Sequence, residues 1–350
     1  MGSRREFLKK VTQGAGGVFA GVALLEIRAC QSAAEVERTG KIMSVQGLLE
    51  PREFGMALPH EHVLVDFIGA NKVSRDRYDR QEVIRKVVPY LERVRRLGCD
   101  TLVECTPAYI GRDPMLLRRL STITELQILT NTGYYGAADD KFVPAHAFDE
   151  SPDQLADRWI REGEDGIEGS DIYPGFIKTG VDSGPLSSID EKLVTAAART
   201  HLATGLTIAC HTGGDSAIVG EMEVLEREDV DGRALIWVHA QNEEDPALHV
   251  RAAKAGIWVE FDGIHPDRIE AYVKRVQAMK EAGYIHKVLL SQDAGWYHVG
   301  EPDGGTYRPH DTIFTDFIPA LKSAGISSAD IQQMTVENPR QAFTIRIRRA

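Results

Sequence analysis

The 350-residue chain has few cysteines and no long uninterrupted apolar run, and each scarcity excludes a class of protein. Its four cysteines do not form a disulfide scaffold, because Cys99 and Cys105 flank a short apolar run. If extended, that run would hold them roughly 20 Å apart, whereas bridged Cα atoms lie within about 7 Å. Cys210 is expected to be a buried free thiol. The apolar stretch 11–25 is broken by glycines and falls short of the roughly 20 residues of a membrane-spanning helix.

Negative charge is in excess outside the N-terminus. The chain has a net charge of −11, and residues 1–28 hold five Arg or Lys against two Glu, so the remainder carries −14. A domain this acidic lacks the excess of positive charge that binds a phosphate backbone, which excludes nucleic acid as a partner. With 43% apolar residues the chain can still bury a large core, and one α/β barrel of about 250 residues or more fits its length.

The N-terminus has the pattern of an export signal. Arg4-Arg5 and Phe7-Leu8 precede a weakly hydrophobic, glycine-rich stretch, an order that resembles a twin-arginine signal peptide more than a plain basic tail. We expect residues 1–34 to be this signal and a linker, residues 35–350 to be the folded domain, and the mature protein to be periplasmic or extracellular. Cys30 could carry a lipid, the one membrane attachment expected, although Arg28 fits a lipidation motif poorly.

Short apolar runs alternate with helical patterns over residues 56–323. The runs lie near residues 57, 102, 129, 176, 208, 236, 259 and 289, and each is short enough to be a buried parallel strand. Helical patterns occupy 79–98, 114–124, a segment that opens at 151, 189–204, 217–227, 246–255, 266–282 and 312–323. Eight strand-then-helix units predict an α/β protein, a (β/α)8 TIM barrel with its active site at the C-terminal ends of the strands.

Capping residues mark several of these helices. Asp79 and Glu82 form a capping-box pair ahead of an apolar stripe that stops at Gly98. Ser151 followed by Pro152 predicts a second helix start, because serine caps the free backbone N–H groups and proline suits the first helical position.

Six residues of metal-binding type each follow one of the apolar runs. They end the predicted strands one, four, five, six and eight, whose carboxyl ends meet in a barrel: His60, His62, Lys178, His211, His239 and Asp293. Neutral imidazole nitrogens and a carboxylate suit borderline metals such as zinc. Taken singly, the residues have other readings. The His60–His62 pair could be at the surface, Lys178 could bind a substrate carboxylate, and Asp293 could cap the following helix.

Five motifs in this order resemble those of the phosphotriesterase family of the amidohydrolase superfamily. They are Leu58-Pro59-His60-Glu61-His62, Gly175-Phe176-Ile177-Lys178, Ala209-Cys210-His211, Val238-His239 and Leu290-Ser291-Gln292-Asp293. Segments 40–51, 111–113 and 337–339 extend the resemblance over residues 40–345. The resemblance implies two divalent metal ions, one held by His60, His62 and Asp293 and the other by His211 and His239. It also implies a CO₂-derived carbamate on Lys178, which turns a repelling ammonium into an anionic bridging ligand. Zinc is the expected metal, with manganese, cobalt or iron as alternatives.

The chemistry that this resemblance implies is hydrolysis by a metal-bridging hydroxide. Asp293 is expected to accept the proton of the attacking hydroxide and to pass it to the leaving group. We expect the substrate to be a small carboxylic ester or lactone. The alternatives are an organophosphate triester, an N-acyl amide and, from a different class, a non-catalytic metal-binding lipoprotein. The resemblance also implies a homodimer.

Further candidates line the predicted substrate side. Tyr135 sits where the lactonase branch of the family has a tyrosine that contacts the bridging solvent. Asp262 is a candidate for relaying protons away from Asp293, although Gly263 follows it where that branch has an arginine.

The loop after Asp293 is unusually long. Trp296, Tyr297 and Arg308 could form an aromatic wall with one cationic anchor, or the same residues could belong to an ordered lid or a dimer contact. His265 is a further candidate for facing substrate, as are His298 and His310.

Overall fold

The computed structural model describes residues 38–214 and 216–350 and contains a compact unit, Gly40–Ala350. The predicted twin-arginine segment and Cys30 lie outside the described residues and stay predictions. Within the described part of the chain, no helix is both long enough and apolar enough to cross a membrane.

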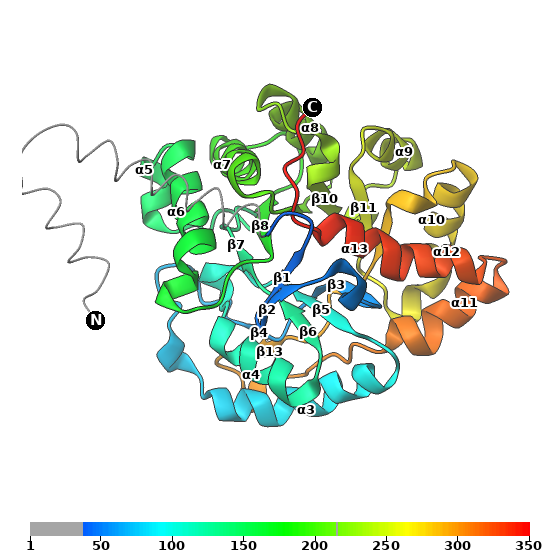
Figure 1. The fold of residues 1–350 in the computed structure, drawn as a ribbon, viewed down its shortest axis with the longest axis horizontal. Helices are drawn as coiled ribbons and strands as arrows, with labels where there is room; N and C mark the ends of the chain where they lie inside the picture. The colour runs from blue at the N-terminus through cyan, green and yellow to red at the C-terminus, as the bar shows by residue number, and fades with distance from the viewer. Residues whose placement is uncertain (1–37, 215) are drawn as a thin grey trace, which may run out of the picture. The chain divides into compact units, whose positions relative to one another are not determined.

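Eight parallel strands form the centre of this unit, and helices surround them (Figure 1). The strands pair in chain order, and all eight coincide with the predicted apolar runs. They are β3 (Ala57–Glu61), β5 (Thr101–Glu104), β6 (Gln127–Leu129) continued by β7 (Asn131–Thr132), β8 (Phe176–Val181), β9 (Ile208–Thr212), β10 (Leu235–Val238), β11 (Trp258–Phe261) and β12 (Val288–Leu290). The predicted (β/α)8 barrel is therefore confirmed.

The seam of the barrel lies between its first and last strands. β3 and β12 are the outer strands of their respective sheets. Across the seam, the Asp293 N–H donates to the His60 carbonyl at 3.1 Å, and the Ser291 hydroxyl oxygen accepts from the His60 N–H at 2.9 Å. At the seam, the Ser291 side chain accepts a backbone hydrogen bond that a backbone carbonyl accepts between the other strands.

Strand alternation sorts side chains into two cores. Phe176 and Ala209 point into the barrel, where they pack with Leu289, whereas Ile177 and Cys210 face the surrounding helices. Both cores are fully buried, so these strands are apolar on both faces, as parallel strands under helices must be.

The first long helix, α3 (Arg80–Arg96), shows how the predicted caps are realised. The Asp79 carboxylate accepts hydrogen bonds from the Gln81 and Glu82 backbone N–H groups, so Asp79 caps the helix, but the return bond from the Glu82 side chain is not formed. The inward stripe is buried, whereas Leu97, predicted at the end of that stripe, is 41% exposed.

The remaining helices include every predicted one, in the predicted order, and three short helices at 145–149, 328–332 and 338–343 that were not predicted. They are α4 (Pro114–Thr124), α5 (Ala145–Asp149), α6 (Pro152–Asp165), α7 (Ser188–Thr204), α8 (Ala217–Arg227), α9 (Pro246–Lys254), α10 (Ile269–Glu281), α11 (Ile318–Ser323), α12 (Ser328–Gln332) and α13 (Asn338–Phe343). Ser151 caps α6 as predicted. The predicted helix 312–323 begins as a π-helical turn over Ile313–Phe317 before it becomes α11.

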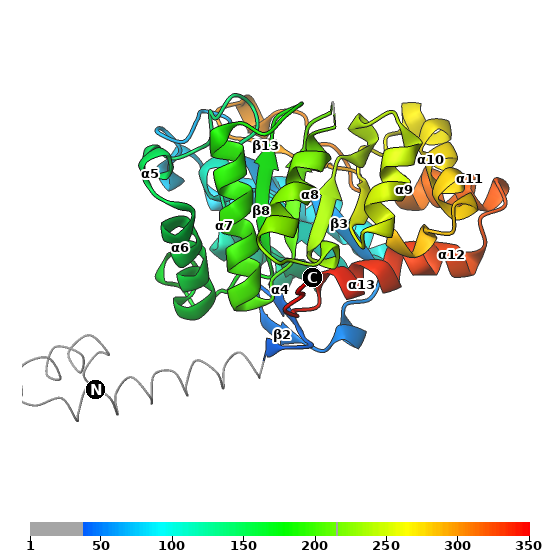
Figure 2. The same ribbon diagram turned by 90° about the horizontal axis from the view of Figure 1, so that it is seen from above.

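Two small sheets mark the two ends of the barrel (Figure 2). The hairpin of β1 (Ile42–Ser44) and β2 (Gly47–Leu49) lies at the amino end of the strands. At the carboxyl end, β4 (Leu64–Val65) pairs in parallel with β13 (Tyr297–His298). This second pair ties the segment after β3 to the long loop after β12.

Candidate metal centre

Three of the predicted ligands meet at the seam. His60 and His62 come from β3, and Asp293 follows β12. The Asp293 Oδ1 atom lies 3.1 Å from His62 Nε2 and 3.7 Å from His60 Nε2. Their ligand atoms all lie within 4.8 Å of one another, so the three residues could hold one metal ion.

The other three lie beside them. The ring centroids of His211 and His239 are 4.4 Å apart, and those of His60 and His239 are 4.9 Å apart. Lys178 is 2% exposed, and its Nζ makes no hydrogen bond with any described residue. The same cluster includes Tyr135, whose ring centroid lies 5.0 Å from that of His211 and 6.0 Å from Lys178 Nζ. The structure therefore brings all six predicted residues together.

Pleating and three local distortions aim these side chains inward. Lys178 and His211 continue the inward alternation of Phe176 and Ala209. In β3 a register shift between Leu58 and Glu61 inserts an extra residue, which turns His60 to the inner face. His239 and Asp293 have φ values of +61° and +51°, in the left-handed region that non-glycine residues seldom occupy.

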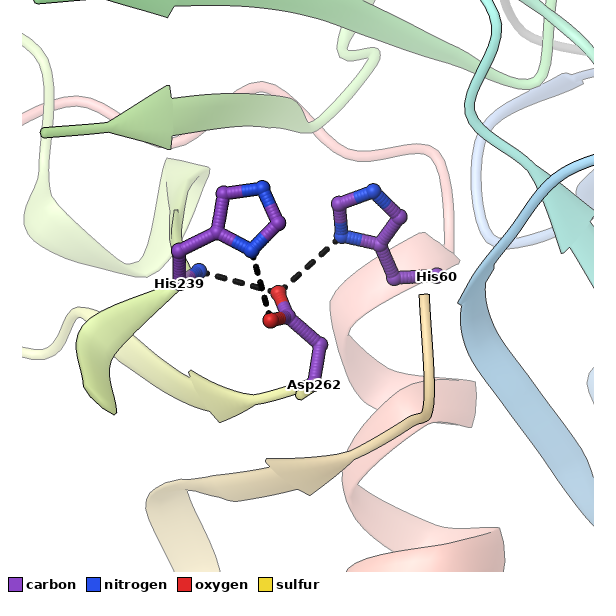
Figure 3. A group of neighbouring side chains, drawn as sticks. All are labelled: His60, His239 and Asp262. Atoms are coloured by element: carbon purple, nitrogen blue, oxygen red, sulfur yellow. Dashed lines mark hydrogen bonds and ion pairs between the residues drawn. The ribbon is translucent and has the colours of Figure 1, made fainter. Parts of the chain in front are cut away.

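The Asp262 carboxylate contacts the Nδ1 atoms of two imidazoles, His60 and His239 (Figure 3). Its oxygens lie 2.6 Å from His239 Nδ1 and 3.0 Å from His60 Nδ1, and they also accept from the Gln241 side chain at 2.6 Å. Because an ionised carboxylate only accepts hydrogen bonds, each Nδ1 carries a proton and Nε2 is the nitrogen that is left to bind a metal. Asp262 thus orients the rings of His60 and His239. Its predicted part in a proton relay stays a prediction.

His62 is oriented by a similar chain. Its Nδ1 lies 2.8 Å from the Thr106 hydroxyl, which donates to Glu104 at 2.5 Å. The Thr106 oxygen therefore accepts the Nδ1 proton of His62, and Nε2 is again left free. Burial raises the pKa of Glu104 to about 7, an effect that these hydrogen bonds oppose.

The protonation of two imidazoles bears on metal binding. Burial and the neighbouring His239 and Lys178 hold the pKa of His211 well below its usual value, so this imidazole is neutral and able to ligate. Burial also lowers the pKa of His60, but the hydrogen bond and charge of Asp262 outweigh it and raise that pKa to about 10. A metal bound at His60 must therefore displace a proton, which makes binding depend on pH.

Glu61, between the two histidines, has a separate role that the sequence pattern does not reveal. It is fully buried and accepts from the Ala294 N–H at 2.7 Å and the Gln292 N–H at 3.0 Å, while His310 Nδ1 lies 3.1 Å away. Glu61 therefore fixes the backbone on both sides of Asp293. His310, a candidate for facing substrate, belongs to this buried network.

Trp296 forms one wall beside the ligands. Its indole N–H donates to the Asp293 carbonyl at 2.7 Å, and its ring centroid lies 4.5 Å from that of His62. The Phe67 ring lies 5.5 Å from Trp296 and is 38% exposed. The His298 ring also stacks on the Trp296 ring, with their centroids 6.1 Å apart. An apolar rim thus borders the centre on the β12 side.

Tyr297 and His265 lie apart from this rim. The side chain of Tyr297 lines a different cavity of about 690 Å³, together with Arg77, Tyr78 and Glu82 near the start of α3. The side chain of His265 is 44% exposed and pairs with Asp267. The structure shows no contact of either side chain with the described ligand residues. The expected aromatic wall therefore includes Trp296 but not Tyr297.

The described cysteines are free thiols, as expected. Cys99, Cys105 and Cys210 are buried and unbridged, and burial raises the pKa of each thiol. Cys210 lies directly before His211 but faces the helices, so it is not among the inward-facing ligands.

Sequence comparisons agree with this geometry. The model of the phosphotriesterase family matches residues 40–343. A phosphotriesterase homology protein from Escherichia coli is 28% identical over 83% of this chain and 98% of its own length. An aryldialkylphosphatase from Saccharolobus solfataricus is 25% identical over 85% of this chain and 97% of its own. An N-acetyltaurine hydrolase from Dictyostelium discoideum is 24% identical over 88% and 99%.

Solved structures share the fold. A mutant of an organophosphorus hydrolase from Deinococcus radiodurans superposes with a TM-score of 0.77 at 25% identity, over 86% of this chain and 97% of its own. A lactonase from Listeria monocytogenes has a TM-score of 0.75 at 22% identity, over 87% and 99%. Because the family model spans nearly the whole described unit, the chain belongs to the phosphotriesterase family, whose members are metal-dependent hydrolases of small esters or phosphates.

Proposed function

We propose that the protein is a binuclear metal-dependent hydrolase that cleaves a carboxylic ester or lactone. The observation that carries this proposal is the state of Lys178, a buried amine without a hydrogen-bond partner among four imidazoles and one carboxylate. A buried unpaired ammonium is costly, and beside metal cations it would be more so. Carbamylation by CO₂ removes the positive charge and supplies oxygen ligands.

The donor set fits two divalent ions, with zinc as the proposed metal and manganese, cobalt or iron as alternatives. His60, His62 and Asp293 would hold one ion, His211 and His239 the other, and carbamylated Lys178 both. Bound there, the two ions supply an activated water and polarise the oxygen of the scissile group.

Protein groups then handle the proton and the substrate. Asp293 accepts the proton of the attacking water and returns it to the leaving group. The pKa of Asp293 is raised by burial but lowered more by His62 and His60, so the carboxylate is ionised and able to accept. Tyr135, in ring contact with His211, would donate a hydrogen bond to the attacking water.

The identity of the substrate rests on weaker grounds. Relatives are named for a phosphotriester and for an amide substrate, and a structural neighbour is a lactonase. The alternatives to an ester or lactone are therefore an organophosphate triester and an N-acyl amide. A non-catalytic metal-binding lipoprotein is the alternative from another class, but it would not need an aligned proton acceptor at Asp293.

The test is hydrolysis by the purified protein loaded with zinc or manganese in bicarbonate. Aliphatic γ- and δ-lactones, an aryl ester, an aryl phosphotriester and N-acetyltaurine would be compared by acid or product release, with Asp293→Asn as the control. We expect the ester or lactone to be fastest and the variant to be inactive. Faster turnover of the phosphotriester or the amide would replace the proposed substrate class. Two bound metals without any hydrolysis would favour the non-catalytic alternative.

We also propose export by the twin-arginine route, to the periplasm or the cell exterior, and assembly as a homodimer. Replacing Arg4 and Arg5 by lysine should retain the protein in the cytoplasm, as measured by cell fractionation. Cys30→Ser should release the protein from membranes if Cys30 carries a lipid. Light scattering of the purified protein would give the oligomeric state.

A further inference from the structure

Arg308 is held at the carboxyl edge of the barrel by a backbone pairing within the long loop. Gly295 and Arg308 form an antiparallel bridge, with N–H to carbonyl distances of 3.0 and 2.9 Å. Gly295 has a φ of +100°, and a Cβ there would lie 1.8 Å from the His62 carbonyl oxygen, so glycine is required. This close approach fixes the backbone of Arg308 against the strand end that carries His62.

The guanidinium of Arg308 lacks the acidic partner that a buried arginine normally has. Its Nη2 is buried and makes no hydrogen bond, and no described acidic residue forms an ion pair with it. The contrast is with Arg112, which is 2% exposed and makes two hydrogen bonds to Glu162 at 2.7 and 2.8 Å.

The carboxylates around the centre are already engaged. Asp262 accepts from His60, His239 and Gln241, and Glu61 from the backbone on both sides of Asp293. None of these groups can turn toward Arg308 without abandoning buried hydrogen bonds. The planar guanidinium therefore keeps donors for an anion from outside the chain.

The charge of Arg308 acts on the β11 side of the barrel. Burial and the charge of Asp262 raise the pKa of Tyr272, and Arg308 is among the charges that oppose this rise. The Tyr272 hydroxyl occupies the space that a side chain at position 263 would take, next to Asp262 in the chain. The backbone bridge to Gly295 keeps Arg308 at the same edge of the barrel as the candidate ligands.

We propose that Arg308 binds an anionic group, a carboxylate or a sulfonate, at the end of the substrate remote from the scissile bond. This inference rests on the proposed hydrolase function and specifies its substrate class as an anionic ester, lactone or amide. Two parallel N–H donors suit the paired oxygens of either anion. The rim of Trp296 and Phe67 supplies the apolar contact for the carbon chain between the two groups.

The test compares matched substrates that differ by one charge. The 4-nitrophenyl ester of butyric acid and the mono-4-nitrophenyl ester of succinic acid would be assayed with the metal-loaded wild type, Arg308→Gln and Arg308→Lys. Arg268→Gln is the matched control, because it removes the same charge from an exposed residue near Tyr272.

We expect Arg308→Gln to raise KM for the succinate ester by roughly 10- to 100-fold, since a charge-assisted hydrogen bond pair is lost, and to leave the butyrate ester unchanged. Arg308→Lys should retain part of the preference, and Arg268→Gln all of it. Equal effects of Arg308→Gln on both esters, or no preference in the wild type, would overturn the proposal.

Failure of the proposed hydrolysis is distinguishable. If neither ester is cleaved, the anion site is tested alone by the rise in Tm that N-acetyltaurine or glutarate produces in the metal-loaded protein. A rise that Arg308→Gln abolishes and Arg268→Gln preserves supports the anion site without the hydrolase. A rise equal in both variants, or no rise, overturns it.

Discussion

The carboxylate of Asp262 lies 2.6 Å from Nδ1 of His239, and neither oxygen of that carboxylate reaches water. The same carboxylate also contacts His60, so one buried group sets the tautomer of two imidazoles of the candidate metal centre. A group of this kind controls metal affinity through ring orientation and basicity.

Asp262→Asn should therefore weaken metal binding without unfolding the protein. The amide can accept from only one imidazole at a time, and its NH₂ would oppose the Nδ1 proton of the other. We expect the affinity for zinc to fall roughly 10- to 100-fold, measured by titration against a chelating indicator. Asp267→Asn, at a 65% exposed carboxylate, is the control and should have no effect. Unchanged affinity in Asp262→Asn would contradict the orienting role.

Replacement of Lys178 tests the carbamate directly. Lys178→Gly removes the amine and leaves room for a small carboxylate, so the variant should bind fewer metal ions and lose activity, and acetate should partly restore both. Metal content is measured by elemental analysis. In the wild type, loading the metal in CO₂-free buffer should lower occupancy, and bicarbonate should restore it. Full occupancy without CO₂ would mean that Lys178 acts as an amine.

The barrel and its ligand ends were predictable because they depend on local rules. Residues 114–124 and 217–227 were predicted as helices and have these bounds, since each has an amphipathic pattern over its length. The meeting of the six candidate ligands also follows from their place at strand ends in a parallel barrel.

What could not be predicted depends on contacts between distant segments. Glu61 is one of three polar residues in a row. Only its hydrogen bonds across the seam show that its role differs from that of the candidate ligands His60 and His62. Tyr297 was predicted to form an aromatic wall with Trp296. Its pairing with Leu64 in β4 instead directs its side chain to the cavity near the start of α3. No periodicity in one loop specifies such a pairing.

Loss of the Glu61 charge should loosen the loop that carries Asp293. Glu61→Gln keeps the shape, but its amide group supplies one acceptor oxygen where the carboxylate supplies two. We expect a free energy of unfolding lower by about 2 kcal/mol and a fall in kcat larger than the rise in KM, because Asp293 loses its position. Denaturant titration and steady-state kinetics measure the two effects. Glu301→Gln, at a side chain that is 57% exposed, is the control.

Acid should destabilise the fold through His201, in the last turn of α7. Its Nδ1 donates to the Leu206 carbonyl at 2.8 Å, and its Nε2 accepts from the Arg348 N–H at 2.9 Å, so both nitrogens are satisfied only in the neutral ring. Burial lowers the pKa of His201 to about 4. Between pH 6.5 and 4 the unfolded chain therefore binds more protons, and stability falls as the pH falls, by at most about 3 kcal/mol.

The measurement is Tm against pH for the wild type and His201→Gln. The variant should be less stable at pH 7, because one hydrogen bond is lost, but it should show a shallower decline between pH 6.5 and 4. Parallel curves would show that another group titrates in this range.

The seam between β3 and β12 has a consequence for when the centre can form during synthesis. Its closing hydrogen bond joins residues 231 positions apart, and the ligands His60 and Asp293 lie on opposite sides of it. A ribosome-bound chain that has released only the first half-barrel lacks Asp293, His211 and His239 altogether. The proposed metal capture would then follow translation of nearly the whole barrel, as a late step of a high-contact-order fold. The proposed export of finished, loaded protein would suit such a chain, because earlier passage would separate the two ends that the proposed metal would join.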